Sequence, residues 1–79
     1  MDTFSAVKTA ARDADMSLRA LCRALGKSDN YIANNASRGS DPSARNAAAM
    51  FEACGYRLAA VPFRDVPPSA LVVDPPDAV

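Results

Sequence analysis

The sequence contains no histidine and no tryptophan, and it has a single glutamate, Glu52, among its 79 residues. Histidine is the most frequent general acid or base in enzymes, and no other residues here form a catalytic pattern. Because histidine and CxxC cysteine pairs are both missing, the usual ligands of a structural zinc ion are missing as well. We therefore expect no enzymatic activity, no metal site and no cofactor.

Long apolar runs are also missing, since no uninterrupted stretch approaches the ~20 residues that a membrane-spanning helix needs. The first residues, from Met1 to Phe4, lack the basic start and the apolar stretch of a signal peptide. We expect a cytoplasmic protein with no membrane contact. Cys22 and Cys54 both fall on apolar helical faces, so we expect them to be reduced core residues.

Neither sign of charge is in excess, because nine lysines and arginines balance nine acidic residues. The distribution is uneven, however: residues 1–64 carry a net charge of +3 and residues 65–79 carry −3. Residues 16–45 alone carry +3. Local charge sets the field at a binding surface, so a neutral total still permits a nucleic-acid partner.

Three glycines divide the sequence, and each follows a stretch of helical character: Gly26, Gly39 and Gly55. Glycine just past a helix end adopts the left-handed conformation without steric cost. Helices are therefore predicted over residues 3–14, 18–25, 29–37 and 44–54.

Serines precede the last three predicted helices and can cap their first turns: Ser17, Ser28 and Ser43. Apolar residues recur at helical spacing within all four segments. The spacing predicts these inward-facing residues: Phe4, Val7, Ala11, Ala14, Leu18, Leu21, Cys22, Leu25, Ile32, Ala36, Ala47, Met50, Phe51 and Cys54.

The character of the chain changes after Gly55, because β-prone residues and prolines replace the helical pattern. Residues 57–74 are compatible with a β-hairpin or with two arms that pair across a dimer. A disordered proline-rich tail after Pro62 is the alternative. We divide the chain into a helical domain over residues 1–62 and an arm or tail over residues 63–79.

The segment from Ser17 to Ile32 combines a short helix, a glycine turn and a second helix. A short turn that contains glycine sets two helices at a steep angle, and a small side chain such as Cys22 lets them approach. The second helix then protrudes and can enter a DNA major groove. This order of elements is typical of a helix-turn-helix.

The segment resembles the lambda-repressor-like (Xre/Cro) helix-turn-helix family over roughly residues 3–62. Three further pieces carry the resemblance: Arg38-Gly39, Asp41-Pro42-Ser43, and the run from Ala53 to Leu58. The resemblance implies an all-α domain of four to five helices, with a short extended or β-hairpin C-terminal segment. Lys27 and Asn35 stand where the family usually has apolar residues, so we expect the third helix to be thinly anchored.

Asparagine can bind adenine through two hydrogen bonds, and the resemblance places Asp29, Asn30 and Asn34 at base-reading positions. Asp29 has two interpretations: it accepts from a cytosine amino group, or it merely suits a positive helix N-terminus. The third helix also has a simpler interpretation, in which its polar residues only face solvent and bind nothing. Contacts to the DNA backbone are predicted for Ser17, Arg19, Lys27, Ser28, Tyr31 and Arg38.

Two functions follow from this arrangement. The first is a sequence-specific regulator that binds double-stranded DNA, such as a small phage or mobile-element repressor of the Cro type. As a homodimer it would contact half-sites about 34 Å apart. The second is a protein-interaction module on the same fold, such as an antitoxin or a phage protein, whose C-terminal tail binds a partner protein.

Overall fold

The structure is a computed structural model, and it describes residues 1–76. Its elements are four α-helices and one 3₁₀ turn: α1 (Thr3–Asp13), α2 (Leu18–Ala24), α3 (Tyr31–Ser37), α4 (Ala44–Ala53) and η1 (Phe63–Asp65). Residues 1–76 contain no β-strand, so the predicted all-α class is confirmed. The β-hairpin, one of the alternatives for residues 57–74, is wrong. Within the same residues, no helix is long and apolar enough to cross a membrane.

The local signals set most helix ends. Asp2, Ser17 and Ser43 each accept a hydrogen bond from a backbone N–H of the first turn of α1, α2 and α4, at 2.8, 3.0 and 3.1 Å respectively. Gly26, the first of the three predicted stop signals, has a φ of +71°. Its conformation lets the Lys27 N–H turn back and donate to the Cys22 carbonyl oxygen at 2.9 Å. The hydrogen bonds that Ser17 and Ser43 accept confirm both as the predicted caps.

The predicted start of the third helix is wrong. The helix α3 begins at Tyr31 rather than Asp29, and Ser28 does not cap it. The Ser28 carbonyl oxygen accepts from the Tyr31 N–H at 3.1 Å, so residues 28–31 form a turn ahead of the helix. Asn30 is the residue at the N-cap, and its side chain makes no capping hydrogen bond.

The core lies where α1 packs against α4 and α2. All four inward-facing residues predicted for α4 are buried, as are Leu21, Cys22 and Ile32. Both cysteines are free and buried, as predicted. The apolar face predicted for α1 is too narrow. Ala6 and Ala10 are also buried, because both α2 and α4 pack against α1. Ala14, which was predicted to face inward, lies past the end of α1 and is exposed.

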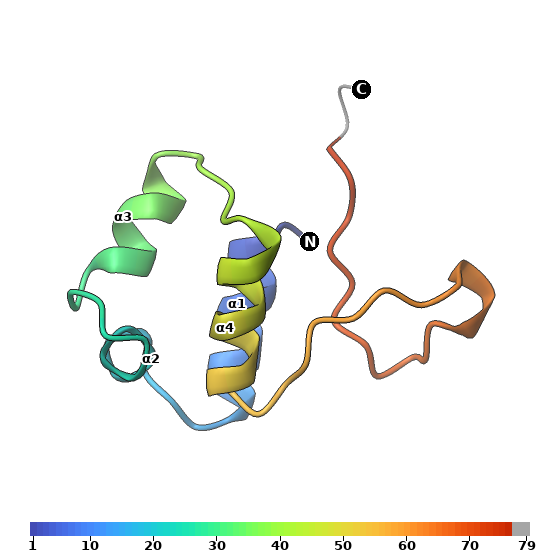
Figure 1. The fold of residues 1–79 in the computed structure, drawn as a ribbon, viewed down its shortest axis with the longest axis horizontal. Coiled ribbons are helices and arrows are strands. Elements are labelled where there is room, and N and C mark those ends of the chain that lie inside the picture. Colours follow the sequence, from blue (N-terminus) through green and yellow to red (C-terminus); the bar gives the residue numbers. More distant parts are fainter. Residues whose placement is uncertain (77–79) are drawn as a thin grey trace.

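The helix α3 packs chiefly against α2 and stands away from the α1–α4 pair (Figure 1). Ile32 is its one fully buried side chain, and Ala36 is half-buried. Open hollows of about 180, 190 and 200 Å³ lie between α3, with the loop that follows it, and the rest of the domain. Their walls include Phe4, Tyr31 and Met50. The sparse burial agrees with the expected thin anchorage of this helix.

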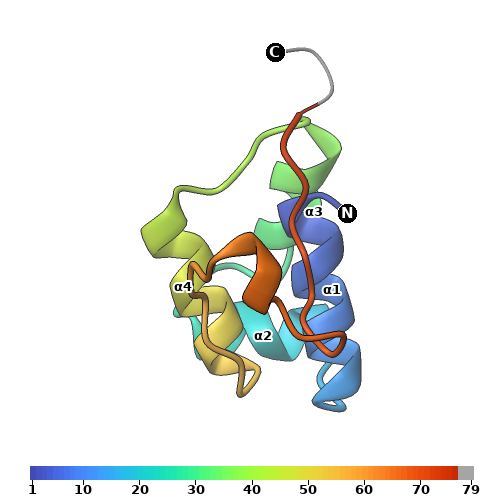
Figure 2. The ribbon, with the colours of Figure 1, turned by 90° about the vertical axis from the view of Figure 1, so that its right-hand side faces the viewer.

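The segment after α4 leaves the helices, forms η1, and returns along α1 (Figure 2). Leu71 packs against the core. The Asp74 N–H donates to the Met1 carbonyl oxygen at 2.9 Å, and the Asp74 carboxylate forms an ion pair with the Met1 amino group. The arm therefore follows a defined path up to residue 76, whereas its last three predicted residues, 77–79, lie outside the described residues.

Candidate nucleic-acid interface

The turn between α2 and α3 places the two helices around a small apolar elbow. Leu21 and Cys22 of α2 and Ile32 of α3 all have no exposed surface, so the two helices share a sealed contact. A bulky residue in place of Cys22 would separate the helices, because close helix approach needs small side chains at the contact. Cys22, the small side chain that the sequence predicted between these two helices, therefore lies in their contact.

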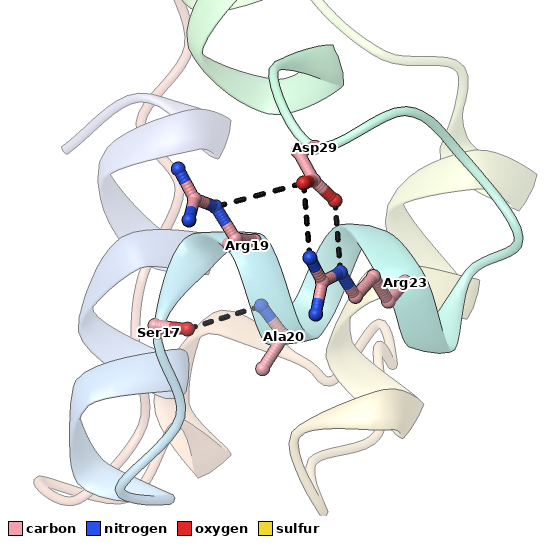
Figure 3. A network of polar contacts seen from close by, with 5 residues as sticks. All are labelled: Ser17, Arg19, Ala20, Arg23 and Asp29. Carbon is pink, nitrogen blue, oxygen red and sulfur yellow. Dashed lines mark hydrogen bonds and ion pairs between the residues drawn. The ribbon is translucent and has the colours of Figure 1, made fainter.

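An ion pair joins α2 to the turn that precedes α3 (Figure 3). The Arg23 guanidinium donates two hydrogen bonds to the Asp29 carboxylate, Nε to Oδ1 at 3.0 Å and Nη2 to Oδ2 at 3.1 Å. The Arg19 Nε lies 3.6 Å from Asp29 Oδ2. One carboxylate on the turn therefore gathers two arginines of α2 into a fixed group.

The pKa values reflect this pairing. The Arg23 hydrogen bond, joined by the nearby charges of Arg23 and Arg19, holds the pKa of the Asp29 carboxyl below its ordinary value. In return, the hydrogen bond to Asp29 raises the pKa of Arg23. Both groups are thus charged throughout the neutral range. Neither of the two interpretations of Asp29 anticipated the pairing, because the residues are six positions apart and lie on different elements.

The side chains of Asn30 and Asn34 are exposed at the start of α3 and one turn further along it. Residues four positions apart lie on the same side of a helix, so Asn30 and Asn34 are neighbours along α3. Ser37 lies further along α3 and is tied to the helix itself, because its hydroxyl donates to the Asn34 carbonyl oxygen at 3.0 Å. The structure thus leaves two amide side chains accessible on the outward face.

Lys27 and Asn35, the two departures from the family pattern, both act on Tyr31. The Lys27 Nζ lies 5.3 Å from the centre of the Tyr31 ring, within the range of a cation–π contact. The half-buried Asn35 amide donates to the Tyr31 carbonyl oxygen at 2.7 Å. Tyr31 itself is half-buried and packs against the core. The Asn35 hydrogen bond lies within α3 itself, so of these two polar contacts only the one from Lys27 links α3 to the turn before it.

The predicted DNA-backbone residues lie around the same two helices. Arg19, Lys27, Ser28 and Arg38 are all exposed, and Arg38 caps the C-terminal end of α3. The Ser17 hydroxyl is already engaged, since it accepts the Ala20 N–H that it caps. Contacts of these residues with DNA remain a prediction.

Metal binding has no visible basis in residues 1–76, where no three histidine, cysteine, aspartate or glutamate side chains lie close enough to hold an ion. Comparison with models of known protein families finds no match, and no curated protein and no solved structure matches the chain.

Proposed function

We propose that this protein is a sequence-specific double-stranded DNA-binding regulator of the helix-turn-helix type, with α3 in the major groove. The observation that carries the proposal is the placement of α3, which stands away from α1 and α4 (Figure 1). Asn30 and Asn34 are both exposed, at its N-cap and one turn further along. A single exposed helix of this width fits the ~12 Å major groove of B-DNA. The resemblance to the lambda-repressor-like family supports the same assignment.

Asn30 and Asn34 are the proposed base contacts, because an asparagine amide matches the donor and acceptor edge of adenine. Lys27, Ser28 and Arg38 flank them as the proposed phosphate contacts, at both ends of α3. The local excess of positive charge over residues 16–45 supports this surface. The short turn η1, which contains an acidic residue, lies at the opposite end of the molecule from α3 (Figure 1).

Asp29 acts in this proposal as a positioning residue rather than as a base contact. Both of its oxygens already accept from Arg23, so a cytosine amino group would have to compete with a charged donor. The pair holds the turn before α3 to α2, next to a helix whose apolar anchorage is sparse. It also holds the Arg19 and Arg23 side chains beside Asp29 (Figure 3).

The experiment that tests the proposal selects bound sequences from a random duplex pool at 50 mM salt and then measures affinity for the selected site. We expect Asn30→Ala and Asn34→Ala each to weaken specific binding by about 1–3 kcal/mol while non-specific binding changes little. Asn46→Ala, an exposed asparagine on α4, is the matched control and should bind like the parent chain. Lack of any DNA affinity at this salt would reject the proposal and favour the protein-interaction alternative.

A further inference from the structure

An apolar hollow of about 250 Å³ lies between the end of α4 and the chain segment that follows it. This segment leaves α4, forms η1 and returns along α1 (Figure 2), and both its outgoing and its returning parts contribute to the walls. The apolar residues of the walls include Phe51, Leu58, Val61, Ala70, Leu71 and Val73. Because sites for drug-sized ligands have volumes of about 300–1,000 Å³, the hollow suits a smaller molecule.

Contacts on both sides fix the shape of the hollow. The Tyr56 hydroxyl donates to the Asp13 carboxylate at 3.2 Å, which ties the outgoing part of the segment to α1. Leu71 packs against the core, and the Asp74 N–H donates to the Met1 carbonyl oxygen, so the returning part is fixed as well. A site that is formed before binding costs little ordering free energy when a ligand enters it.

Three apolar side chains of the walls remain partly in contact with water. Leu58, Val61 and Val73 are exposed by 41, 49 and 39% of their surface. Removing apolar surface from water is favourable, and the gain grows with the area that is covered. A ligand that covers these side chains is therefore expected to be apolar over most of its own surface.

A single charged side chain, that of Arg57, lines the hollow among the described residues of its walls. Its Nη2 donates to Glu52 Oε1 at 3.1 Å, and Glu52 does not line the hollow. A guanidinium has five N–H donors, so most of those of Arg57 are left for another acceptor. Exposed ion pairs are weak, so Glu52 competes little for them.

We propose that the hollow binds a small apolar monocarboxylate, whose hydrocarbon part lies against the walls and whose carboxylate binds the Arg57 guanidinium. Size supports the fit, because apolar cavities of about 150 Å³ take up benzene, and this hollow of about 250 Å³ has room for a phenyl ring with a short substituent. A carboxylate matches the planar fork of a guanidinium through two parallel hydrogen bonds.

The charge of the site selects among ligand classes. One guanidinium balances one negative charge, whereas a doubly charged phosphate group would bring a second charge into apolar walls. A cationic ligand would meet Arg57 as a like charge. A neutral ligand of the same shape would gain the apolar contact but not the ionic one, so it should bind more weakly.

The site goes beyond the proposed function and does not depend on it. No residue of α3 lines the hollow, and binding is measured without DNA. Amide NMR spectra of the full chain are recorded during titration with phenylacetate. The amides of Ala59 and Leu71 should shift and saturate, with a dissociation constant on the order of 1 mM, as expected for so small a ligand. Phenylacetamide, which has the same shape without the charge, should bind several-fold more weakly.

Substitutions separate the ionic contact from the apolar one. Arg57→Gln should weaken phenylacetate binding several-fold, to the level of phenylacetamide, and leave phenylacetamide binding unchanged. Ala70→Phe fills the hollow from its wall and should abolish the binding of both ligands. Arg64→Gln is the matched control, because it removes an equal charge from an exposed arginine that does not line the hollow, and it should bind like the parent chain.

Thermal unfolding checks the fold of each variant, and Arg57→Gln loses only an exposed ion pair, so its midpoint should change little. Four results would overturn the proposal: no shift at tens of millimolar phenylacetate, equal binding of phenylacetamide, equal effects of Arg57→Gln and Arg64→Gln, or shifts that follow protein rather than ligand concentration. The last result would assign the hollow to another copy of the chain. None of them bears on DNA binding by α3, so the two proposals can fail separately.

Discussion

Asp29 and Arg23 join the turn before α3 to α2 through two parallel hydrogen bonds of 3.0 and 3.1 Å. A two-pronged pair of this kind fixes orientation as well as distance, because both nitrogens must face both oxygens. Ile32 is the only fully buried side chain of α3, so few other contacts determine how this helix sits. The ion pair therefore contributes to the position of α3 against α2.

Breaking this pair should separate specific from non-specific DNA binding. In Asp29→Asn the neutral amide no longer forms an ion pair with Arg23, so α3 is held less firmly. Affinity for the selected site should then fall several-fold. Removal of a negative charge near phosphates should at the same time strengthen non-specific binding. The ratio of the two affinities at two salt concentrations measures the effect.

The control for that substitution is Asp41→Asn, which removes an equal charge from the loop between α3 and α4. It should strengthen both kinds of binding alike, because Asp41 is exposed and lies outside the Arg23–Asp29 pair. If Asp29→Asn behaved in the same way as Asp41→Asn, Asp29 would be a simple repulsive charge and not a positioning residue.

The capping serines should differ in their contributions to stability. Ser17→Ala and Ser43→Ala each remove the acceptor of a first-turn N–H and should lower the free energy of unfolding by about 1 kcal/mol. Ser28→Ala should change it by less than about 0.5 kcal/mol, because Ser28 caps no helix. Urea unfolding of the three variants decides the matter, and an equal loss for Ser28→Ala would contradict the observed start of α3.

Backbone conformation predicts opposite effects at two helix ends. Gly26 has a φ of +71° and no atom within 4 Å of a built Cβ, so Gly26→Ala is penalised by conformation alone, by about 1–2 kcal/mol. Asp15, after α1, is the one non-glycine residue with a positive φ, +57°, among residues 1–76. Asp15→Gly should therefore stabilise the protein, and thermal midpoints of the two variants should move in opposite directions.

Stability should decline at acidic pH. Asp2 has a lowered pKa because its carboxylate accepts the Ser5 N–H, and Asp29 has one because of Arg23. A lowered pKa in the folded state gives stability that is complete well above the unfolded value of about 3.9 and is lost as the pH falls through the folded value. Thermal midpoints from pH 6 to pH 2.5 should therefore drop most steeply below about pH 4.

Asp2→Asn provides the matched variant for this titration, because asparagine caps a helix nearly as well as aspartate but does not titrate. Its midpoint should fall less between pH 5 and pH 2.5 than that of the parent chain. A drop of the same size in both proteins would show that other carboxylates control the acid sensitivity.

Local chemistry determines much of this structure without any tertiary contact. Ser17, Ser43 and Gly26 mark helix ends because a cap or a left-handed glycine acts within one turn of its own residue. The buried face of α4 follows from its 3.6-residue period, since one side of that helix meets the core. The all-α class, the free buried cysteines and the glycine turn between α2 and α3 could therefore be predicted.

Only the tertiary structure decided the features that depend on residues far apart in the chain. The two helices on α1 widened its buried face to include Ala6 and Ala10. Arg23 engaged Asp29 across the turn, and Leu71 and Asp74 brought the arm back onto the domain. These contacts form between side chains on different elements, so they have no period or local signal in the sequence, and their free energy depends on where the folded chain places both partners.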